Sequence, residues 1–519
     1  MITKRFVALV AAGLALRLTM AWLPVRHMVA HTLPDDAFIY FVIARHLAAG
    51  LGATFDGVAP TNGFHPLWAL ALTPIFGALP QGDLPVHLAL TLSAICDTAA
   101  GVLAGWVAWR SVAVEGTARE RHAYRSHSAM ITTALYLFNP RAIVESINGL
   151  ETGLAMLALA ACVAAWQIAR ESLTTRRTVA FGVLAGLTVL ARSDLGVIVA
   201  VLGLDLFIRP MFVDTLRRQV LRNGVIAGIA AVVVVAPWFI WSQLRLGTIA
   251  QSSGVAIPSL VAYTIQNSDP AMLWNSLLFP IINVSLRNAI IYPGAAIIAF
   301  VASAILNLRN SNSNSNSNSN SNSNSNFLWL PVVGALLIIL IHTFVRWYPR
   351  GWYFVPLAWG TALAVGPAAV AGFATALGKR LAVWIWIGIG VVVIAQMIKT
   401  INEPGPKWQA DMVAGAEWLA ANTSPDDTVG AFNAGIYAYY SGRRVINLDG
   451  LVDWGAIEAR REKRLLDYFA SRGGTLLIDH HDYIWNSFSP FFGERSLELV
   501  AELPVADTTY GPIVVYRVR

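Results

Sequence analysis

The chain has 519 residues, of which 56% are hydrophobic and only 13% are charged, and its formal net charge is +7. A soluble domain carries about 25% charged residues, so this composition excludes a wholly soluble protein and indicates a polytopic membrane protein. Most arginines lie in short segments between apolar runs, where they orient membrane spans, so we do not expect nucleic-acid binding. Cys96 and Cys162 lie in separate apolar runs, which excludes a disulfide framework.

Eleven apolar runs predict membrane spans, because about 20 apolar residues cross a bilayer. These runs are 6–23, 87–109, 128–144, 150–169, 179–192, 195–208, 223–242, 289–307, 327–345, 352–377 and 380–401. The run Pro66–Leu79 is shorter, as is typical of a re-entrant or interfacial segment. Residues 310–326 alternate Asn and Ser, a composition that cannot bury apolar surface and predicts disorder.

The basic residues indicate which side of the membrane each loop faces. If Pro66–Leu79 does not cross, the arginine-rich loops all lie in the cytoplasm, as the positive-inside rule requires. If it does cross, every later basic loop lies outside. We therefore expect a cytoplasmic N-terminus, a first outer loop at 24–86 and an extracytoplasmic C-terminal region.

The first outer loop contains two adjacent carboxylates, Asp35 and Asp36, close to the end of the first span. Charges at a membrane surface cost free energy unless they have a partner or a function. Residues Asp36–Ala49 predict an amphipathic helix with Asp35 as its N-cap. The residues predicted to face the membrane are Phe38, Phe41 and Val42.

Two further residues of the outer face are candidates for the same site. His65 fits a ligand, an acid or base, or a polar interfacial side chain equally well. Glu151 begins an apolar helix, where the helix dipole favours a carboxylate. Capping and a role in the site therefore both remain open for Glu151.

Arginines also occur on the predicted outer face. Arg192 and Asp194 join two spans, and they either neutralise each other or present a guanidinium to a phosphate. Arg346 and Arg350 lie in an aromatic segment and oppose the positive-inside bias, which favours anion binding.

From about residue 402 the composition becomes that of a soluble domain. Trp408–Asn422 predicts an amphipathic helix. Short β-like runs follow at Thr428–Phe432, Arg444–Leu448, Thr475–Asp479, Glu498–Leu503 and Ile513–Val518. This alternation predicts a small α/β domain at 402–519. The segment Val429–Gly435 lacks the full dinucleotide fingerprint, so a structural turn is favoured over cofactor binding.

The outer face thus collects carboxylates and arginines. A carboxylate can act as general base on a sugar hydroxyl, and arginines can hold a lipid-linked phosphate leaving group. A lipid-glycan flippase or transporter is an alternative, but it needs ionisable residues deep in the spans, where only Asp97 and Asp205 are exceptions to an apolar composition. A non-catalytic envelope-assembly protein is a second alternative, in which the acidic pair only caps a helix.

The segment Asp35–Trp68, DDAFIYFVIARHLAAGLGATFDGVAPTNGFHPLW, resembles the first outer loop of the GT-C glycosyltransferases. It is most similar to the branch that contains the arabinofuranosyltransferases of the cell envelope, as are NGLETGL, ARSDLG and YYSGRRVINLDGLVD later in the chain. The resemblance implies an α-helical polytopic protein of the bacterial inner membrane. Its GT-C-like domain would cover 1–401, and an extracytoplasmic α/β domain would cover 402–519.

The same resemblance implies an inverting transfer of a sugar from a polyprenyl-phosphate donor. The acceptor would be a glycan, a lipid or a protein of the envelope. By position, Asp35 matches the catalytic acidic residue of the family, with Asp36 beside it. Some members hold a divalent cation, Mg or Mn; the ligand set in this chain is unknown, with Glu151 and His65 as candidates.

Overall fold

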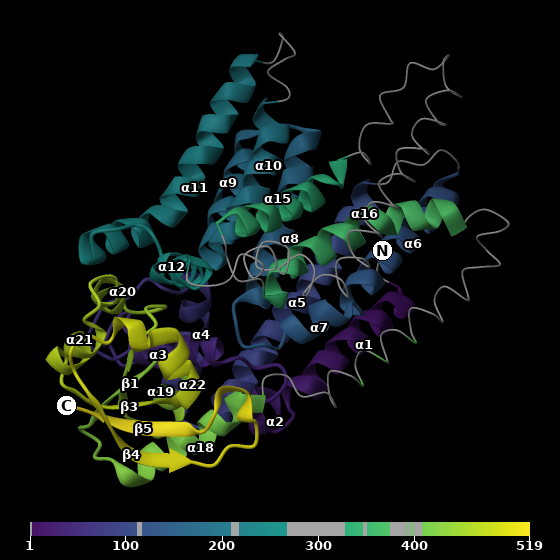
Figure 1. Ribbon diagram of the computed structural model, residues 1–519. Helices are drawn as coiled ribbons and strands as arrows, with labels where there is room; N and C mark the ends of the chain where they lie inside the picture. Colours follow the sequence, from purple (N-terminus) through teal and green to yellow (C-terminus); the bar gives the residue numbers. More distant parts are fainter. Residues whose placement is uncertain are drawn as a thin grey trace.

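The computed structural model describes residues 3–111, 117–208, 217–266, 327–345, 350–373 and 407–519, with residues 391, 395 and 398. The described residues form a long helical region and a mixed α/β domain at one end of it (Figure 1). The predicted spans 289–307 and 380–401 (apart from those single positions) and the Asn/Ser tract lie outside the described residues.

The helical region follows the apolar pattern of the sequence. Its helices are α1 (Lys4–Ala21), α2 (Val25–Val29), α3 (Asp35–Ala48), α4 (Pro66–Ala78), α5 (Asp83–Ser111), α6 (Ala118–Leu137), α7 (Pro140–Glu145), α8 (Thr152–Glu171), α9 (Thr175–Ala191), α10 (Gly196–Gly203), α11 (Arg217–Leu246), α12 (Ser252–Gln266), α15 (Leu330–Phe344) and α16 (Val355–Phe373). Short helical turns include η1 (Ser193–Leu195), η2 (Leu204–Ile208) and η7 (Gly351–Phe354).

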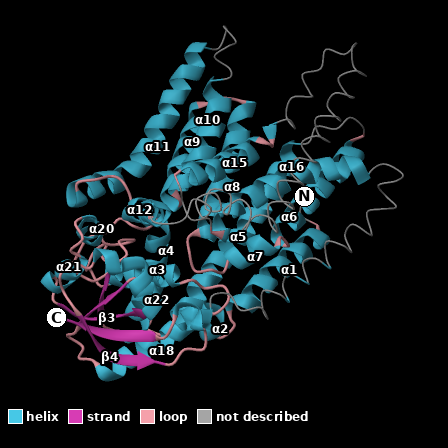
Figure 2. Cartoon of the chain, in the orientation of Figure 1, coloured by secondary structure: helices cyan, strands magenta, loops and turns pink. Residues whose placement is uncertain are grey.

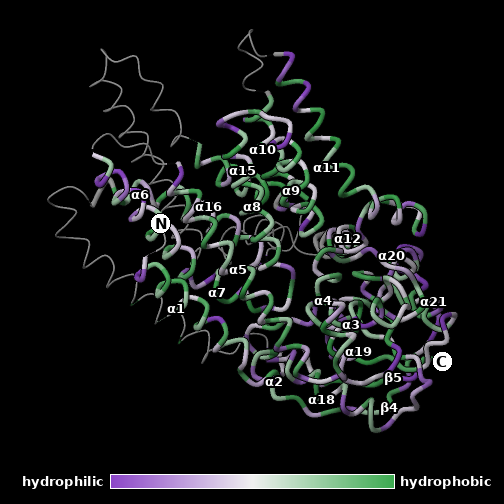
Figure 3. The backbone as a smooth tube through the Cα atoms, turned by 180° about the vertical axis from the view of Figure 1, so that it is seen from behind, coloured by the Kyte–Doolittle hydropathy of each residue, from purple (hydrophilic) through white to green (hydrophobic). Residues whose placement is uncertain are grey.

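Four of the described helical segments are long and apolar enough to cross a membrane. They are Asp83–Ser111, Thr152–Glu171, Arg218–Leu246 and Gly351–Val370. Each coincides with a predicted span, which confirms a multi-pass membrane protein. The helix α4 is apolar but short, in agreement with the prediction for Pro66–Leu79. Hydrophobic residues dominate α9, α11 and α15 (Figure 3), and α11 exposes most of its apolar side chains.

Two carboxylates within the membrane helices are paired with arginines. Arg17 donates from Nε to Asp97 Oδ2 at 2.9 Å, and the hydroxyl of Tyr136 donates to the other oxygen of Asp97. Arg170 Nε lies 2.9 Å from Asp205 Oδ2. A buried charge is tolerated when it is paired and hydrogen-bonded. These pairs account for both carboxylates within the helix bundle, which gives no support to the transporter alternative.

The strands of the C-terminal domain lie together at one end of the molecule (Figure 2). They form a five-stranded sheet with the order β2-β1-β3-β5-β4. Its strands are β1 (Thr428–Ala431), β2 (Arg444–Asn447), β3 (Gly474–His480), β4 (Leu497–Leu503) and β5 (Ile513–Val518). Its helices include α18 (Lys407–Asn422), α19 (Gly435–Ser441), α20 (Trp454–Arg461), α21 (Leu465–Ser471) and α22 (His481–Tyr483). All five predicted strands and the predicted helix at the start of the domain are confirmed.

The strands β1, β2 and β3 run parallel, so their carboxyl ends meet at one edge of the sheet. The turn after β1 is held at this edge by Asp479, which accepts from the backbone N–H groups of Phe432 at 3.2 Å and Asn433 at 2.9 Å. These bonds explain the glycine-containing segment 429–435 as a structural turn. In open α/β sheets this edge is also where ligands bind.

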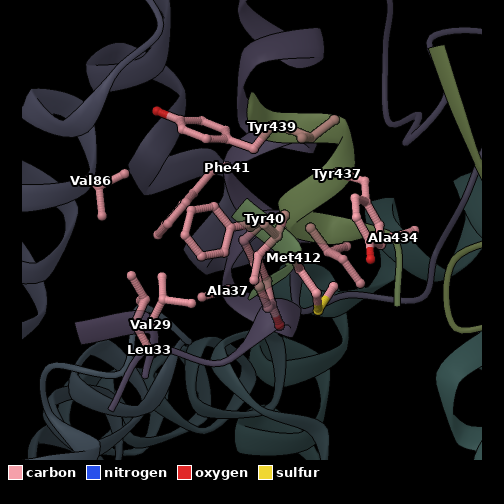
Figure 4. Packing of buried hydrophobic residues seen from close by; sticks show 14 of the residues in the cluster. Val29, Leu33, Ala37, Tyr40, Phe41, Val86, Met412, Ala434, Tyr437 and Tyr439 are labelled. Atoms are coloured by element: carbon pink, nitrogen blue, oxygen red, sulfur yellow. The ribbon is translucent and has the colours of Figure 1, made fainter. Parts of the chain in front are cut away.

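A single hydrophobic core joins the first outer loop to the C-terminal domain. It contains side chains of α3, α4 and α5 together with those of α18 and α19 (Figure 4). Phe38 and Phe41 are fully buried, and their ring centroids lie 5.4 and 6.0 Å from that of Tyr439 in α19. The prediction that Phe38, Phe41 and Val42 face the membrane is therefore wrong, because neighbouring protein elements such as α19 bury this helix.

Candidate functional site

The two adjacent aspartates at the start of α3 have different surroundings. The N-cap of α3 is Pro34, so the prediction that Asp35 caps this helix is wrong. The carboxylate of Asp35 instead accepts from the backbone N–H groups of Gly435 at 3.1 Å and Ile436 at 2.6 Å. Both carboxylate oxygens of Asp35 are thus bound to the first turn of α19.

The C-terminal domain encloses Asp35. Its side chain is buried, and its backbone N–H donates to Gln409 Oε1 at 3.0 Å. Burial raises the pKa of Asp35 to about 8, against the opposing effect of the two N–H donors. A Cβ atom on Gly435 would lie 2.2 Å from the carbonyl oxygen of Asp35, so the two segments approach as closely as glycine allows.

Asp36 is half-buried and makes no hydrogen bond or ion pair with any residue that the structure describes. Burial raises the pKa of its carboxyl, and the negative charge of Glu151 adds to this effect. The guanidinium of Arg350 acts in the opposite direction. Asp36 therefore belongs to a polar cluster that also contains Glu151 and Arg350.

Glu151 and His65 are brought together in this cluster, as the sequence analysis proposed. The hydroxyl of Tyr40 donates to Glu151 Oε2 at 3.0 Å, and His65 Nε2 lies 3.8 Å from Glu151 Oε1. The backbone N–H of His65 donates to the hydroxyl oxygen of Tyr40 at 3.1 Å. Glu151 occupies the N-cap position of α8 but makes no capping bond with its side chain, so the contacts favour a role in the site over capping. Burial lowers the pKa of His65, which keeps the imidazole neutral at pH 7.

Arg192 is buried against its own neighbours. It is 1% exposed, and it donates to Asp194 Oδ2 at 2.6 Å and to the carbonyl oxygen of Trp352 at 3.0 Å. Its guanidinium lies over the ring of Tyr353, 4.9 Å from the centroid. These contacts favour the alternative in which Arg192 and Asp194 neutralise each other, and they join η1 to η7.

Arg350 is exposed and immediately precedes η7. Burial raises the pKa of Asp36 and of Tyr483 in α22, and the charge of Arg350 offsets part of both rises. Arg346, the other arginine predicted in this segment, lies outside the described residues.

The C-terminal domain adds two residues that the sequence analysis did not single out, Asp449 and Tyr483. Asp449 follows β2, is 6% exposed and accepts from the backbone N–H of Leu451 at 2.8 Å. Burial raises the pKa of Asp449 to about 7, and the charge of Asp36 contributes to this rise. The segment YYSGRRVINLDGLVD contained Asp449, but its spacing gave no signal for a carboxylate that acts more than 400 positions away.

An apolar cavity of about 230 Å³ lies beside this cluster. Its lining residues are Pro66, Val189, Leu190, Ser193, Trp238, Phe239, Ile249 and Gln251. Ser193 Oγ donates to Gln251 Oε1 at 3.1 Å, and Gln251 Nε2 lies 3.4 Å from His65 Nδ1. The cavity thus has walls from α9 and α11 and a polar end at His65.

Comparison with known structures identifies the architecture. The structure is similar to the crystal structure of ArnT from Cupriavidus metallidurans in the apo state, with a TM-score of 0.53 and 13% identity over 98% of this chain and 97% of that chain. The chain has the ArnT fold. This result confirms the predicted fold class at the level of ArnT, whereas the arabinofuranosyltransferase-like branch remains a prediction.

Sequence comparison adds one match. Residues 401–516 match a family model described as a domain of unknown function (DUF8728). No curated protein sequence matches the chain. The matched residues cover most of the C-terminal domain.

A divalent cation does not fit the side chains at this site. Among the residues that the structure describes, no group of three His, Cys, Asp or Glu side chains is arranged to hold a metal ion. Glu151 and His65 supply only two such groups, and one oxygen of Glu151 accepts from Tyr40. We therefore derive no step through a metal.

Proposed function

We propose that this protein transfers a sugar from a polyprenyl-phosphate donor to an envelope acceptor. ArnT is a GT-C glycosyltransferase that uses a polyprenyl-phosphate sugar, and the ArnT fold over nearly the whole chain supports the same reaction class. The observation that carries the proposal is the position of Asp36. This half-buried carboxylate makes no hydrogen bond within the described segments and shares its polar cluster with Arg350.

Asp36 is the better candidate for the base of the two aspartates. In an inverting transfer, the base takes the proton of an acceptor hydroxyl while that oxygen bonds to the anomeric carbon and the polyprenyl phosphate leaves. The base needs a lone pair that faces the acceptor. The sequence analysis assigns this role to Asp35, but both oxygens of Asp35 accept backbone N–H groups. Asp36 has no such bonds within the described segments, so we assign the proton transfer to Asp36.

Arg350 is the candidate for the phosphate of the donor. A guanidinium binds phosphate oxygens in two places at once and stabilises the negative charge that develops on the leaving group. Arg350 is exposed and its charge acts on Asp36, whereas Arg192 is 1% exposed. We keep Arg346 as a second predicted phosphate contact from the same segment.

The apolar cavity between α9 and α11 suits the isoprenoid chain of the donor. Most of its lining side chains are apolar, Ser193 and Gln251 are polar, and Gln251 lies next to His65. A lipid that enters from the bilayer along these helices would bring its phosphate to the polar cluster. Neutral His65 and the pair Tyr40–Glu151 would then orient sugar hydroxyls by hydrogen bonds.

The remaining predictions follow from this assignment. The site would lie on the extracytoplasmic face of the bacterial inner membrane, with a cytoplasmic N-terminus and the C-terminal domain outside. The acceptor would be a glycan, a lipid or a protein, and the sugar a pentose or hexose. In the described residues, Asp36 is a half-buried carboxylate without a hydrogen bond or ion pair. A non-catalytic assembly protein would not require such a carboxylate.

The proposal is tested with the full-length protein in nanodiscs and undecaprenyl phosphate that carries a radiolabelled pentose or hexose. We expect the wild-type protein to release undecaprenyl phosphate in the presence of envelope glycan. Asp36→Asn should lower this rate about 10²–10⁴-fold. Asp426→Asn, at an exposed position of the C-terminal domain, is the matched control and should keep the wild-type rate. A wild-type rate in Asp36→Asn would contradict the proposal.

A further inference from the structure

The bonds of Asp35 cross the boundary between the membrane region and the C-terminal domain. Asp35 lies 400 positions before Gly435 in the chain, and its carboxylate reaches the backbone of that residue and of Ile436. The first N–H groups of a helix have no acceptor within the helix. Asp35 supplies that acceptor from the other domain.

The turn that precedes α19 leaves room for the contact with Asp35. Asp479 holds the two residues after β1, and Gly435 then leaves room for the main chain of α3. Behind the contact, Tyr439 packs against the ring of Phe41 (Figure 4). Its ring also lies beside that of Phe38. The carboxylate of Asp35 is therefore part of a packed interface, and its bonds fix where α19 begins relative to α3.

Asp56, which lies in the same loop as Asp35, binds the edge of the sheet that β2 forms. Asp56 Oδ2 accepts from Arg444 at 2.9 Å and from Arg472 at 2.7 Å. Asn62 Oδ1 accepts from the indole N–H of Trp454 at 3.0 Å. These contacts fix β2 and the segment that follows it, and this segment carries Asp449.

We propose that Asp35 is a positioning residue that fixes the C-terminal domain over the site, with Asp56 as a second anchor. The loops after the parallel strands then present Asp449 and Tyr483 toward the cluster of Asp36 and Arg350. The two adjacent aspartates thus have separate roles, since one holds the domain and the other faces the substrate. The contact itself stands on the geometry, whereas its effect on catalysis rests on the proposed function.

This assignment also defines the role of the α/β domain. In an open α/β sheet, ligands bind at the carboxyl ends of the parallel strands. Here Asp35 occupies the turn after β1 at this edge. The domain at 401–516 therefore covers the membrane site in a fixed orientation and does not act as a nucleotide-binding domain.

Hydrogen exchange of the full-length protein in nanodiscs tests the contact without any substrate. In Asp35→Asn, the side-chain NH₂ would face a backbone N–H, so one of the two bonds is lost. We expect the amides of Gly435 and Ile436 to exchange about tenfold faster or more, as the loss of a bond to a charged group predicts. Asp36→Asn is the matched control, because Asp36 makes no bond to α19, and it should leave this exchange unchanged. Unchanged exchange in Asp35→Asn would overturn the proposal.

A glycine substitution tests the same interface from the other side. Gly435→Ala would place its Cβ 2.2 Å from the carbonyl oxygen of Asp35, so we expect faster exchange across 435–441. Gly254→Ala is the control in α12, because no atom lies within 4 Å of the Cβ it would add. Equal exchange in these two variants would contradict a tight contact at Gly435.

The release of undecaprenyl phosphate separates positioning from chemistry. Asp36→Asn should remove the acidic limb of the pH profile along with the rate. Asp35→Asn should lower kcat/KM but keep that limb, because the base is still present. If Asp35→Asn removes the acidic limb, Asp35 is the base and the positioning role is overturned. If the wild-type protein releases no undecaprenyl phosphate, the proposed function fails, and the exchange measurements still decide the contact.

Discussion

Two regions of this molecule treat their carboxylates differently. Among the membrane helices, Arg17 Nη2 lies 2.8 Å from Asp97 Oδ2, and both side chains are fully buried. At the seam between α3 and the C-terminal domain, the half-buried Asp36 has no bonded partner among the described residues. The first carboxylate is paired with a cation, and the second has no bond in the described part of the chain.

The difference has a physical reason. A buried ionised group costs several kcal/mol unless a partner offsets the loss of water, so unpaired carboxylates persist where they have a function. The helix interior needs only stability and pairs its charges. The seam holds carboxylates with raised pKa values, such as Asp449 at about 7, and this is typical of a site that exchanges protons with a substrate.

The largest expected effect concerns Asp36. Its substitution by Asn should lower transfer about 10²–10⁴-fold, while the protein remains at least as stable as the wild type because an unpaired charge is removed. Thermal unfolding in detergent, measured beside the rate, checks both parts. If activity and stability are both largely lost, Asp36 has a structural role like that of the paired charges among the membrane helices.

The next effect concerns the interior pair. Arg17→Met leaves Asp97 buried without its cation and should destabilise the protein by about 3–5 kcal/mol. The double variant Arg17→Met, Asp97→Leu removes both charges and should recover most of this loss. The midpoint of thermal unfolding measures both variants. If the double variant is as unstable as the single one, pairing is not what stabilises this region.

A smaller effect is expected at the second anchor of the C-terminal domain. Asp56→Asn weakens the bonds to Arg444 and Arg472 and should cost about 1.5–3 kcal/mol. The N–H groups of Ala59 and Val58 and these arginines hold the pKa of Asp56 below its usual value despite burial. Its contribution is therefore present above about pH 4 and is lost as the pH falls through the lowered folded-state pKa. Limited proteolysis of the C-terminal domain from pH 3 to pH 7 measures this loss, and Asp56→Asn should show a weaker dependence on pH.

The smallest effect is a shift of the pH profile. Because burial raises the pKa of Asp36, the acidic limb of kcat/KM should lie above the usual range of aspartate, near 3.9. Asp36 must lose its proton to act as base, so the rate falls as the pH drops through this value. Arg350→Gln removes a cation that lowers the pKa, so the limb should move to higher pH and the KM of the donor should rise. An unchanged acidic limb would show that the charge of Arg350 does not act on Asp36.

Much of the architecture was predictable because it depends on local patterns. Short β-like runs located all five strands of the C-terminal domain, and apolar runs located the four described helices that are long and apolar enough to cross a membrane. The short length of Pro66–Leu79 correctly predicted a helix too short to span in the usual way. His65 and Glu151, both candidates for the site in the sequence analysis, lie close together, with His65 Nε2 3.8 Å from Glu151 Oε1.

Other predictions failed because the partner lies far away in the chain. The apolar stripe of Phe38 and Phe41 marked these residues for burial, but it did not distinguish lipid from α19 as the covering surface. The same limit applied to Asp35, whose N–H donors were expected in its own helix but belong to another domain.

The sequence by itself determined that two adjacent carboxylates follow the first apolar run of a membrane protein and that an α/β domain follows the membrane region. Hydrophobic period and loop charge are local properties, so they are legible along the chain. Only the tertiary structure decided which aspartate is bonded and which is open, because that depends on the docking of Gly435 against α3 across 400 positions. A hydrogen bond between distant segments depends on where the two segments meet in space. The residues next to Asp35 in the sequence do not identify Gly435 as its partner.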